Sequence, residues 1–189
     1  MNEKERAAVD EMVLAYNTDF AMQDEAKVRK IKRKFLKDFT VDVTKNPQYA
    51  LQLLETAYNE KNADDVELSM DIIGMFDLFS KEYPKEYICL LLKLLEADWH
   101  HEHENIVWIF QQELKISEAV NPLYETALKQ FEYLEYDEFF ALAVKCIWAL
   151  GAIKTKEAIE KLELLARSDN KIIKKNALNQ LKMIRSCGQ

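Results

Sequence analysis

The chain has 189 residues, enough for one domain of ordinary size, with 49% hydrophobic and 31% charged residues. This balance is typical of a globular protein and excludes a disordered chain. Only three glycines and three prolines are present, too few for the many turns of a β-sandwich, a β-barrel or a nucleotide-binding α/β fold. The composition therefore predicts an all-α fold built from long helices.

The sequence gives no indication of export or of membrane insertion. No apolar run reaches the ~18 residues that a transmembrane helix needs. Residues 1–12 are charged and lack the apolar stretch of a secretory signal. The three cysteines, Cys89, Cys146 and Cys187, are far apart and odd in number, which is typical of a reducing compartment. We expect a cytoplasmic protein that makes no contact with a membrane.

The first part of the chain, residues 1–45, predicts two helices, near 3–22 and 24–39. We expect them to cap the end of a stack of repeats. The second predicted helix has one apolar face, and its other face is basic. The favoured interpretation is that the basic face of this cap helix is simply exposed to solvent. The alternative is that it contacts phosphate groups or anionic lipid. The side chains that would make such a contact are Lys27, Lys30, Arg33, Lys34 and Lys37.

Prolines mark a repeat in the rest of the chain. Pro47, Pro84 and Pro122 are 37 and 38 residues apart, and an apolar helical pattern follows each. Proline is well tolerated in the first turn of a helix, where its missing N–H would have no partner. A further 33 residues on, Thr155 has the character of a helix N-cap. These signals predict helices near 47–60, 84–97, 122–134 and 155–167.

A second series of helix starts alternates with the first. Each start is an acidic or Asx cluster, where negative charge complements the positive end of the helix dipole. The clusters are Asp64-Asp65, Glu102 to Glu104, Asp137-Glu138 and Asp169-Asn170. They predict partner helices near 65–81, 103–117, 137–152 and 170–185. The sequence thus predicts about four helix pairs over 46–185 and a short tail over 186–189, all within a single domain that spans residues 1–189.

The last two repeats resemble a known family. In residues 139–153, FFALAVKCIWALGAI, a small residue stands mid-helix at Cys146 and Ala-Leu-Gly stands near the end. Residues 155–184 continue with Asp169 at a turn and small and apolar residues at Ala177 and Leu181. This pattern resembles HEAT-like repeats of the PBS-lyase type, most clearly over 139–184. The resemblance implies a right-handed α-solenoid whose second helices line a concave surface that binds partners.

The net charge of −7 is unevenly distributed. Residues 40–153 contain 21 acidic and 8 basic residues, whereas residues 154–189 contain 4 acidic and 9 basic ones. An acidic region of this size attracts cationic partners and repels nucleic acid. The plainer alternative is that the acids keep the protein soluble. We expect a basic protein partner and consider nucleic acid unfavoured.

Tyr and Trp beside carboxylates are typical of protein interfaces. The run 131–139, FEYLEYDEF, combines both, and Trp148 is predicted to point away from the core stripe of its helix. The alternative is a turn that packs its own aromatic residues and uses its acids as helix caps. The predicted partner-binding residues are Asp64, Asp65, Tyr133, Tyr136, Asp137, Glu138 and Trp148.

Catalytic and metal-binding patterns are weak. All three histidines lie within 99–104, where His100, His103 and Glu104 have the spacing of ligands on one helix turn. The order is not H-E-x-x-H, and an exposed polar turn is the favoured interpretation. Cys89 and Cys146 are predicted to be small core residues rather than nucleophiles. Neither a glycine-rich phosphate loop nor a GxSxG motif is present. We expect no cofactor, no metal and no catalysis.

The sequence thus predicts a protein that acts by binding another protein. Its most concrete form is an immunity-type inhibitor that occludes a basic toxin or effector domain through its acidic surface. A scaffold or adaptor subunit of a larger complex is one alternative. A nucleic-acid-binding solenoid that uses the basic segment 27–37 is another.

Overall fold

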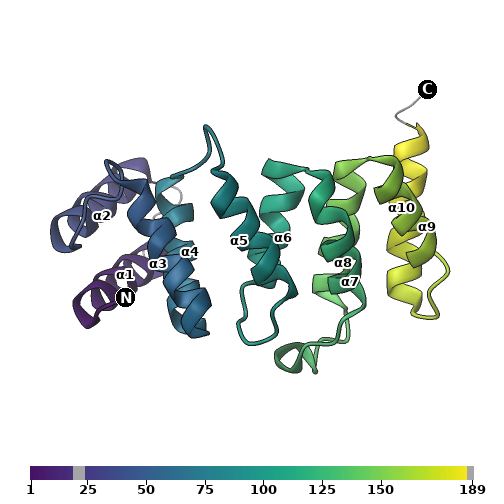
Figure 1. Ribbon diagram of the computed structural model, residues 1–189, viewed down its shortest axis with the longest axis horizontal. Coiled ribbons are helices and arrows are strands. Elements are labelled where there is room, and N and C mark those ends of the chain that lie inside the picture. The colour runs from purple at the N-terminus through teal and green to yellow at the C-terminus, as the bar shows by residue number, and fades with distance from the viewer. Residues whose placement is uncertain (19–23, 187–189) are drawn as a thin grey trace. The chain divides into compact units, whose positions relative to one another are not determined.

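The computed structural model describes residues 1–18 and 24–186 of the chain. The described part contains ten α-helices and no strand, which confirms the predicted all-α class (Figure 1). It divides into two compact units, Met1–Ile88 and Cys89–Gln189. The single domain and the solenoid of helix pairs stay predictions. Cys187 and most of the predicted tail lie outside the described residues.

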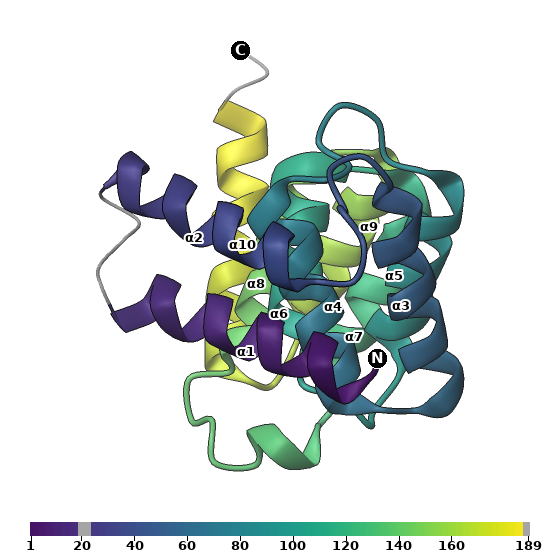
Figure 2. The ribbon, with the colours of Figure 1, turned by 90° about the vertical axis from the view of Figure 1, so that its left-hand side faces the viewer.

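The first unit contains α1 (Glu3–Thr18), α2 (Glu25–Asp38), α3 (Pro47–Glu60) and α4 (Ala63–Phe76). Its helices start where local signals place them, since Pro47 is the first residue of α3 and Asn62 caps α4. α1 packs beside α2 and also contacts α4 (Figure 2). The predicted helix 65–81 ends early, at Phe76, because Asp77 adopts the left-handed conformation that terminates helices.

The amphipathic character of α2 is as predicted. Phe35 and Phe39 are buried with ring centroids 4.6 Å apart, and Phe35 also lies 5.3 Å from the ring of Phe76. The five predicted contact bases of α2 are exposed. Lys34 is not free among them, since its ammonium pairs with Glu11 of α1. The aromatic cluster therefore holds α2 in place, and the remaining bases face solvent.

Asp65 is a structural residue, which corrects its prediction as a partner contact. Its side chain is 1% exposed, and one carboxylate oxygen lies 2.8 Å from the Arg6 guanidinium and 3.0 Å from the Met1 amine. Asp64, the preceding residue in α4, is exposed. A buried carboxylate that is paired with two cations of its own unit is not available to a partner, whereas Asp64 faces solvent.

The second unit continues from α5 (Lys85–Glu96), which begins at the boundary between the units. Its helices are α6 (His103–Ile109), α7 (Val120–Leu128), α8 (Ala141–Ile153), α9 (Lys156–Leu165) and α10 (Lys171–Ser186), with short turns η2 (Phe110–Leu114), η3 (Ser117–Ala119) and η4 (Glu132–Leu134). The central helix is α8, which contacts α6, α7, α9 and α10. Most of its side chains are buried, Cys146 among them, as predicted.

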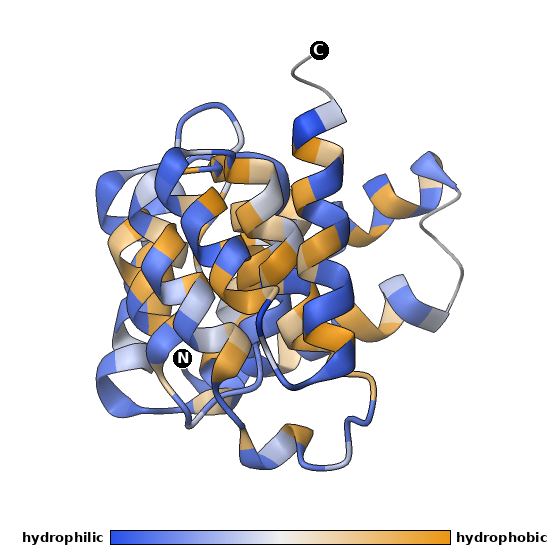
Figure 3. Ribbon diagram, turned by 90° about the vertical axis from the view of Figure 1, so that its right-hand side faces the viewer, coloured by the Kyte–Doolittle hydropathy of each residue, from blue (hydrophilic) through white to orange (hydrophobic). Residues whose placement is uncertain are grey.

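The outer helix α10 is amphipathic. Ile173, Ala177 and Leu181 recur at four-residue spacing and are buried, so apolar and polar bands alternate along the helix (Figure 3). Asn170 begins the helix, because its side-chain oxygen accepts hydrogen bonds from the N–H groups of Ile172 and Ile173. Cys89 differs from its prediction as a core residue, since it lies on the exposed side of α5.

Three predicted helices of this unit are shorter than expected. The predicted helix 122–134 ends at Leu128, and 137–152 begins only at Ala141, so residues 129–140 form a loop. The predicted helix 103–117 changes at Phe110 into the wider π-helical turn η2, which ends at Lys115 in the left-handed conformation. The loop 129–140 supplies most residues of the candidate site.

None of the helices that the structure describes is long and apolar enough to cross a membrane.

Replacement of Asp65 tests its structural role. We expect Asp65→Ala to lower the free energy of unfolding by about 3 kcal/mol, because it leaves the Arg6 guanidinium beside the buried amine without a counterion. The matched control Asp64→Ala removes an exposed acid of the same helix turn and is expected to cost less than about 1 kcal/mol. Chemical denaturation measures both values. Equal losses in the two variants would contradict the assignment.

Candidate partner-binding site

The end of α5 is held by four side chains. The last carbonyl groups of a helix have no partner within the helix. Here the carbonyl oxygens of residues 94–97 each accept a hydrogen bond from a side chain. In the order of the accepting carbonyls, His100 donates to Leu94 at 2.8 Å, Thr126 to Leu95 at 3.3 Å, Lys129 to Glu96 at 2.9 Å and His103 to Ala97 at 2.7 Å. This set ties α7 and the start of the next loop to α5.

Two of these donors are stacked, buried histidines. The rings of His100 and His103 are 4.3 Å apart and nearly parallel, and neither residue is exposed to solvent. This corrects the prediction of an exposed polar turn. Each ring donates from Nε2 to a carbonyl, while Nδ1 accepts, from the Glu102 N–H for His100 and from the Tyr133 hydroxyl for His103. This pattern requires neutral rings.

Burial explains the acid–base behaviour of both histidines. Removal from water disfavours the imidazolium and lowers the pKa of His103 to about 4, although the hydrogen bond to the Ala97 carbonyl acts in the opposite direction. Burial likewise lowers the pKa of His100. Both rings are therefore neutral at physiological pH and serve as fixed hydrogen-bonding groups.

The weak metal candidates are engaged elsewhere. All four ring nitrogens of His100 and His103 take part in hydrogen bonds within the protein. Glu104 forms an ion pair with Lys145 of α8. Among the described residues, no group of three or more His, Cys, Asp or Glu side chains is placed to hold a metal ion. The spacing of His100, His103 and Glu104 thus reflects packing rather than ligation.

We call residues 129–140 the acidic aromatic loop. Its first half is fixed to the histidines. The Tyr133 hydroxyl lies 2.9 Å from Nδ1 of His103, and the Phe131 ring lies 4.1 Å from the His103 ring. The ammonium of Lys129 sits 4.9 Å from the Phe131 ring centroid. The predicted contact residue Tyr133 is therefore half-buried and positions the loop.

The second half of the loop is fixed to the start of α8. The Asp137 carboxylate accepts hydrogen bonds from the N–H groups of Phe139 at 3.0 Å and Ala141 at 2.6 Å. Asp137 thus caps the start of α8, which is the alternative role that the sequence offered for the acids of this run. Its carboxylate is therefore not free to contact a partner. Phe140, between these two residues, has φ 53°. A bulky residue in this left-handed conformation costs of order 1–3 kcal/mol, and such strain clusters at functional sites.

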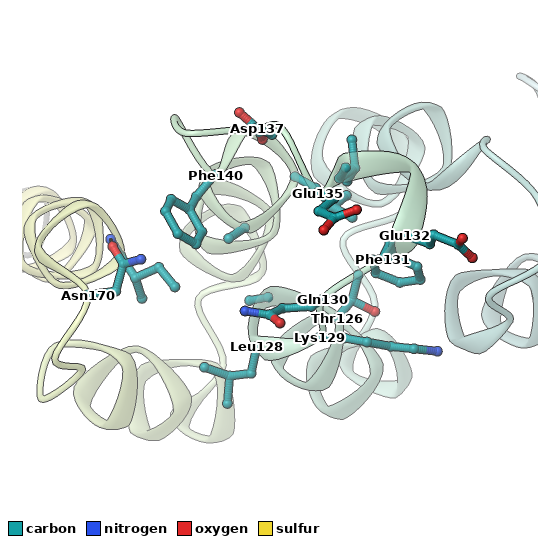
Figure 4. Close-up of a pocket in the computed structure, with 15 residues that line it drawn as sticks. Thr126, Leu128, Lys129, Gln130, Phe131, Glu132, Glu135, Asp137, Phe140 and Asn170 are labelled. Carbon is teal, nitrogen blue, oxygen red and sulfur yellow. Dashed lines mark hydrogen bonds between the residues drawn. The ribbon is translucent and has the colours of Figure 1, made fainter.

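A pocket of about 690 Å³ lies against the loop (Figure 4). Its walls come from the end of α7, the loop, the start of α8 and Asn170 before α10, with the Phe140 ring on the Asn170 side. Three lining residues carry carboxylates, namely Glu132, Glu135 and Asp137. The one lining cation, Lys129, already donates to the Glu96 carbonyl. The pocket is therefore suited to a positively charged group.

Two aromatic side chains of the loop face solvent. Tyr136 is 91% exposed and Phe139 is 78% exposed. Glu138 is exposed as well, and the role of Tyr136 and Glu138 as contact residues stays a prediction. Glu132, Glu135, Phe139 and Phe140 were not predicted as site residues, although the first three fall in the acidic run 131–139. Their role depends on a loop where the sequence pattern predicted helix.

The remaining predicted residues belong to other elements than this loop. Trp148 is 46% exposed on α8 and lines a different groove, against α10. Asp64 and the bases of α2 belong to the unit Met1–Ile88. The structure thus brings together only part of the predicted set, in the loop between α7 and α8: Tyr133, Tyr136, Asp137 and Glu138.

The buried histidines predict a loss of stability in acid. A neutral histidine whose pKa is lowered by folding takes up a proton more readily when unfolded, so stability falls as the pH drops from the unfolded value of 6.5 towards the folded value of about 4. For His103 we expect a loss of roughly 2 kcal/mol between about pH 7 and about pH 5. Urea denaturation across this range measures it.

Two glutamine variants sharpen this test. His103→Gln keeps a donor and an acceptor but does not titrate, so the slope of stability against pH is expected to shrink. The matched variant His101→Gln removes an exposed histidine, and it is expected to change the slope less than His103→Gln does. A slope that His103→Gln leaves intact would show that other groups carry the acid sensitivity.

Comparison of the chain with protein-family models, with curated proteins and with solved structures found no match. The resemblance to HEAT-like repeats therefore stays a prediction.

Proposed function

We propose that this chain is a non-enzymatic binding protein that holds a basic protein partner through the acidic aromatic loop. One observation carries the proposal. The loop presents two almost fully exposed aromatic side chains, Tyr136 and Phe139, among free carboxylates, and it is fastened at both ends. Exposure of these rings to water is unfavourable in the free protein, and a partner that covers the rings removes this unfavourable exposure.

The exposed rings supply the driving force for binding. Burial of a large apolar side chain is favourable by about 1.5–3 kcal/mol, and aromatic residues dominate interface hot spots. Tyr133 and Asp137 anchor the backbone on either side of Tyr136. A loop that is already ordered loses little conformational entropy when a partner docks.

Charge supplies the selectivity. Glu132, Glu135 and Glu138 are exposed around the rings, and the first two line the pocket. A Lys or Arg side chain in this pocket would meet carboxylates and the Phe140 ring. Phosphate groups would be repelled, so the loop favours a basic protein over nucleic acid.

An immunity-type inhibitor and an adaptor subunit are two forms of this function. Both would use the same loop, and they differ in what happens to the partner. An inhibitor abolishes the partner's activity in a stoichiometric complex, whereas an adaptor leaves that activity intact. The identity and activity of the captured partner decide between them.

Affinity capture with paired charge reversals tests the proposal. The tagged protein is used to capture partners from its native lysate at about 150 mM salt with nuclease present, so that nucleic acid does not bridge a complex. We expect the wild-type chain to retain a basic protein in stoichiometric amount. Glu132→Lys combined with Glu135→Lys is expected to lose it. Glu55→Lys with Glu60→Lys, two exposed acids of α3, makes the same charge change elsewhere and is expected to retain it.

A single aromatic substitution measures the hot spot. Tyr136→Ala removes a side chain that makes no hydrogen bond within the described residues, so folding is expected to be unchanged. The dissociation constant for the captured partner is expected to rise about 30-fold, which corresponds to about 2 kcal/mol. Calorimetric titration of the purified pair gives this value. In the capture experiment, loss of the partner by both charge-reversed variants would mean that net charge alone drives binding. Retention of the partner by both variants would show that the acidic aromatic loop does not bind it.

A further inference from the structure

A second surface of the unit Cys89–Gln189 lies between α8 and α10. It is a groove of about 490 Å³, within the range of about 300–1,000 Å³ that ligand sites occupy. Exposed apolar side chains stand on both sides, with Trp148 of α8 46% exposed and Met183 of α10 58% exposed. The acidic aromatic loop contributes no residue to this groove.

The groove is lined with side-chain amides. Gln111 after α6 and Asn176, Asn179 and Gln180 of α10 all border it. Asn176 donates to the Ile172 carbonyl. The amides of Gln111, Asn179 and Gln180 have no hydrogen-bond partner within the described part of the chain, and neither has the indole N–H of Trp148. An amide side chain both donates and accepts, so it can pair with the N–H and C=O groups of a peptide backbone.

Gly151 makes room for one of these amides. A Cβ atom added at Gly151 would lie 2.1 Å from Oε1 of Gln180 and 2.8 Å from its Cδ. Glycine in a helix costs roughly 0.5–1 kcal/mol relative to alanine. The missing methyl group lets the Gln180 amide lie directly over the α8 backbone, beside Trp148 and Ala152.

The charge around the groove is positive. Lys154 at the end of α8 is the only charged residue that lines it among those described. Along α10, Lys175 and Lys182 are four residues before and three residues after Asn179, so these three residues share one helix face, and both lysines are exposed. Lys154 thus lies in the groove and two lysines flank Asn179 at its edge, an arrangement suited to negatively charged side chains.

We propose that the groove between α8 and α10 binds an extended, acidic peptide segment of a protein partner. The amides would pair with its backbone, Trp148 and Met183 would cover one or two of its apolar side chains, and the lysines would select acidic neighbours. A peptide fits better than nucleic acid, because the unit has 15 acidic and 13 basic residues and lacks the strongly basic character of nucleic-acid-binding domains. This proposal does not rest on the function of the acidic aromatic loop.

Selection from a library of random peptides displayed on phage tests the proposal. We expect acidic sequences to be enriched on the wild-type protein. In NMR spectra of the ¹⁵N-labelled chain, the most enriched acidic peptide is expected to shift the Trp148 indole signal and the side-chain amide signals of Asn179 and Gln180. Lys175→Glu combined with Lys182→Glu is expected to weaken its binding at least tenfold.

Two glycine variants separate binding from folding. Gly151→Ala displaces the Gln180 amide, and Gly74→Ala adds a methyl group to α4 with no atom within 4 Å. Both are expected to keep or raise the melting temperature, because alanine favours the helix. Only Gly151→Ala is expected to weaken the peptide, by about tenfold.

Several outcomes would overturn the proposal. They are a failure to enrich acidic peptides, signal shifts that fall outside the groove, an equal effect of Gly74→Ala on binding, or a single-stranded oligonucleotide that binds at the same signals more tightly than the peptide. Basic peptides that shift the signals of residues 129–140 would instead concern the acidic aromatic loop. The proposals for the two sites can therefore be overturned independently of each other.

Discussion

The carbonyl groups at the end of α5 are the constraint on which the candidate site depends. The oxygens of Leu95, Glu96 and Ala97 have no backbone donor where the helix ends, whereas that of Leu94 also accepts from the Ala97 N–H. A buried polar group without a partner costs about 1–3 kcal/mol. His100, His103, Thr126 and Lys129 supply the donors. These donors come from the turn after α5 and from the end of α7, so satisfying one helix end fixes two other segments.

The loop geometry follows from that constraint. His103 donates to α5 from Nε2, so its Nδ1 is free to accept from Tyr133, and the first half of the acidic aromatic loop is held there. Asp137 holds the other end by capping α8. The residues between the two anchors, above all Tyr136, have no core to enter and stay in solvent. Exposed aromatic side chains on an ordered backbone are what a protein-binding surface requires.

The two proposed surfaces differ in charge. The loop between α7 and α8 displays Glu132 and Glu135, whereas Lys154 lines the groove between α8 and α10, and Lys175 and Lys182 share a face of α10 with the lining residue Asn179. Central helix α8 contributes to both surfaces. Leu142 and Ala143 near its start line the pocket beside the loop, whereas Trp148, Gly151 and Ala152 further along line the groove. The two proposals therefore call for partner segments of opposite charge.

The sequence by itself determined the helical class and most helix starts, because caps and apolar periodicity act over a few neighbouring residues. Pro47, Thr155 and Asn170 begin helices as their local signals indicate. Tertiary structure alone decided which neighbour is buried, Asp65 rather than Asp64, and where α7 ends. It also turned an apparent ligand cluster into structural donors, because the contact between His103 and Tyr133 joins residues 30 positions apart. Such contacts depend on how helices pack, and no local pattern encodes them.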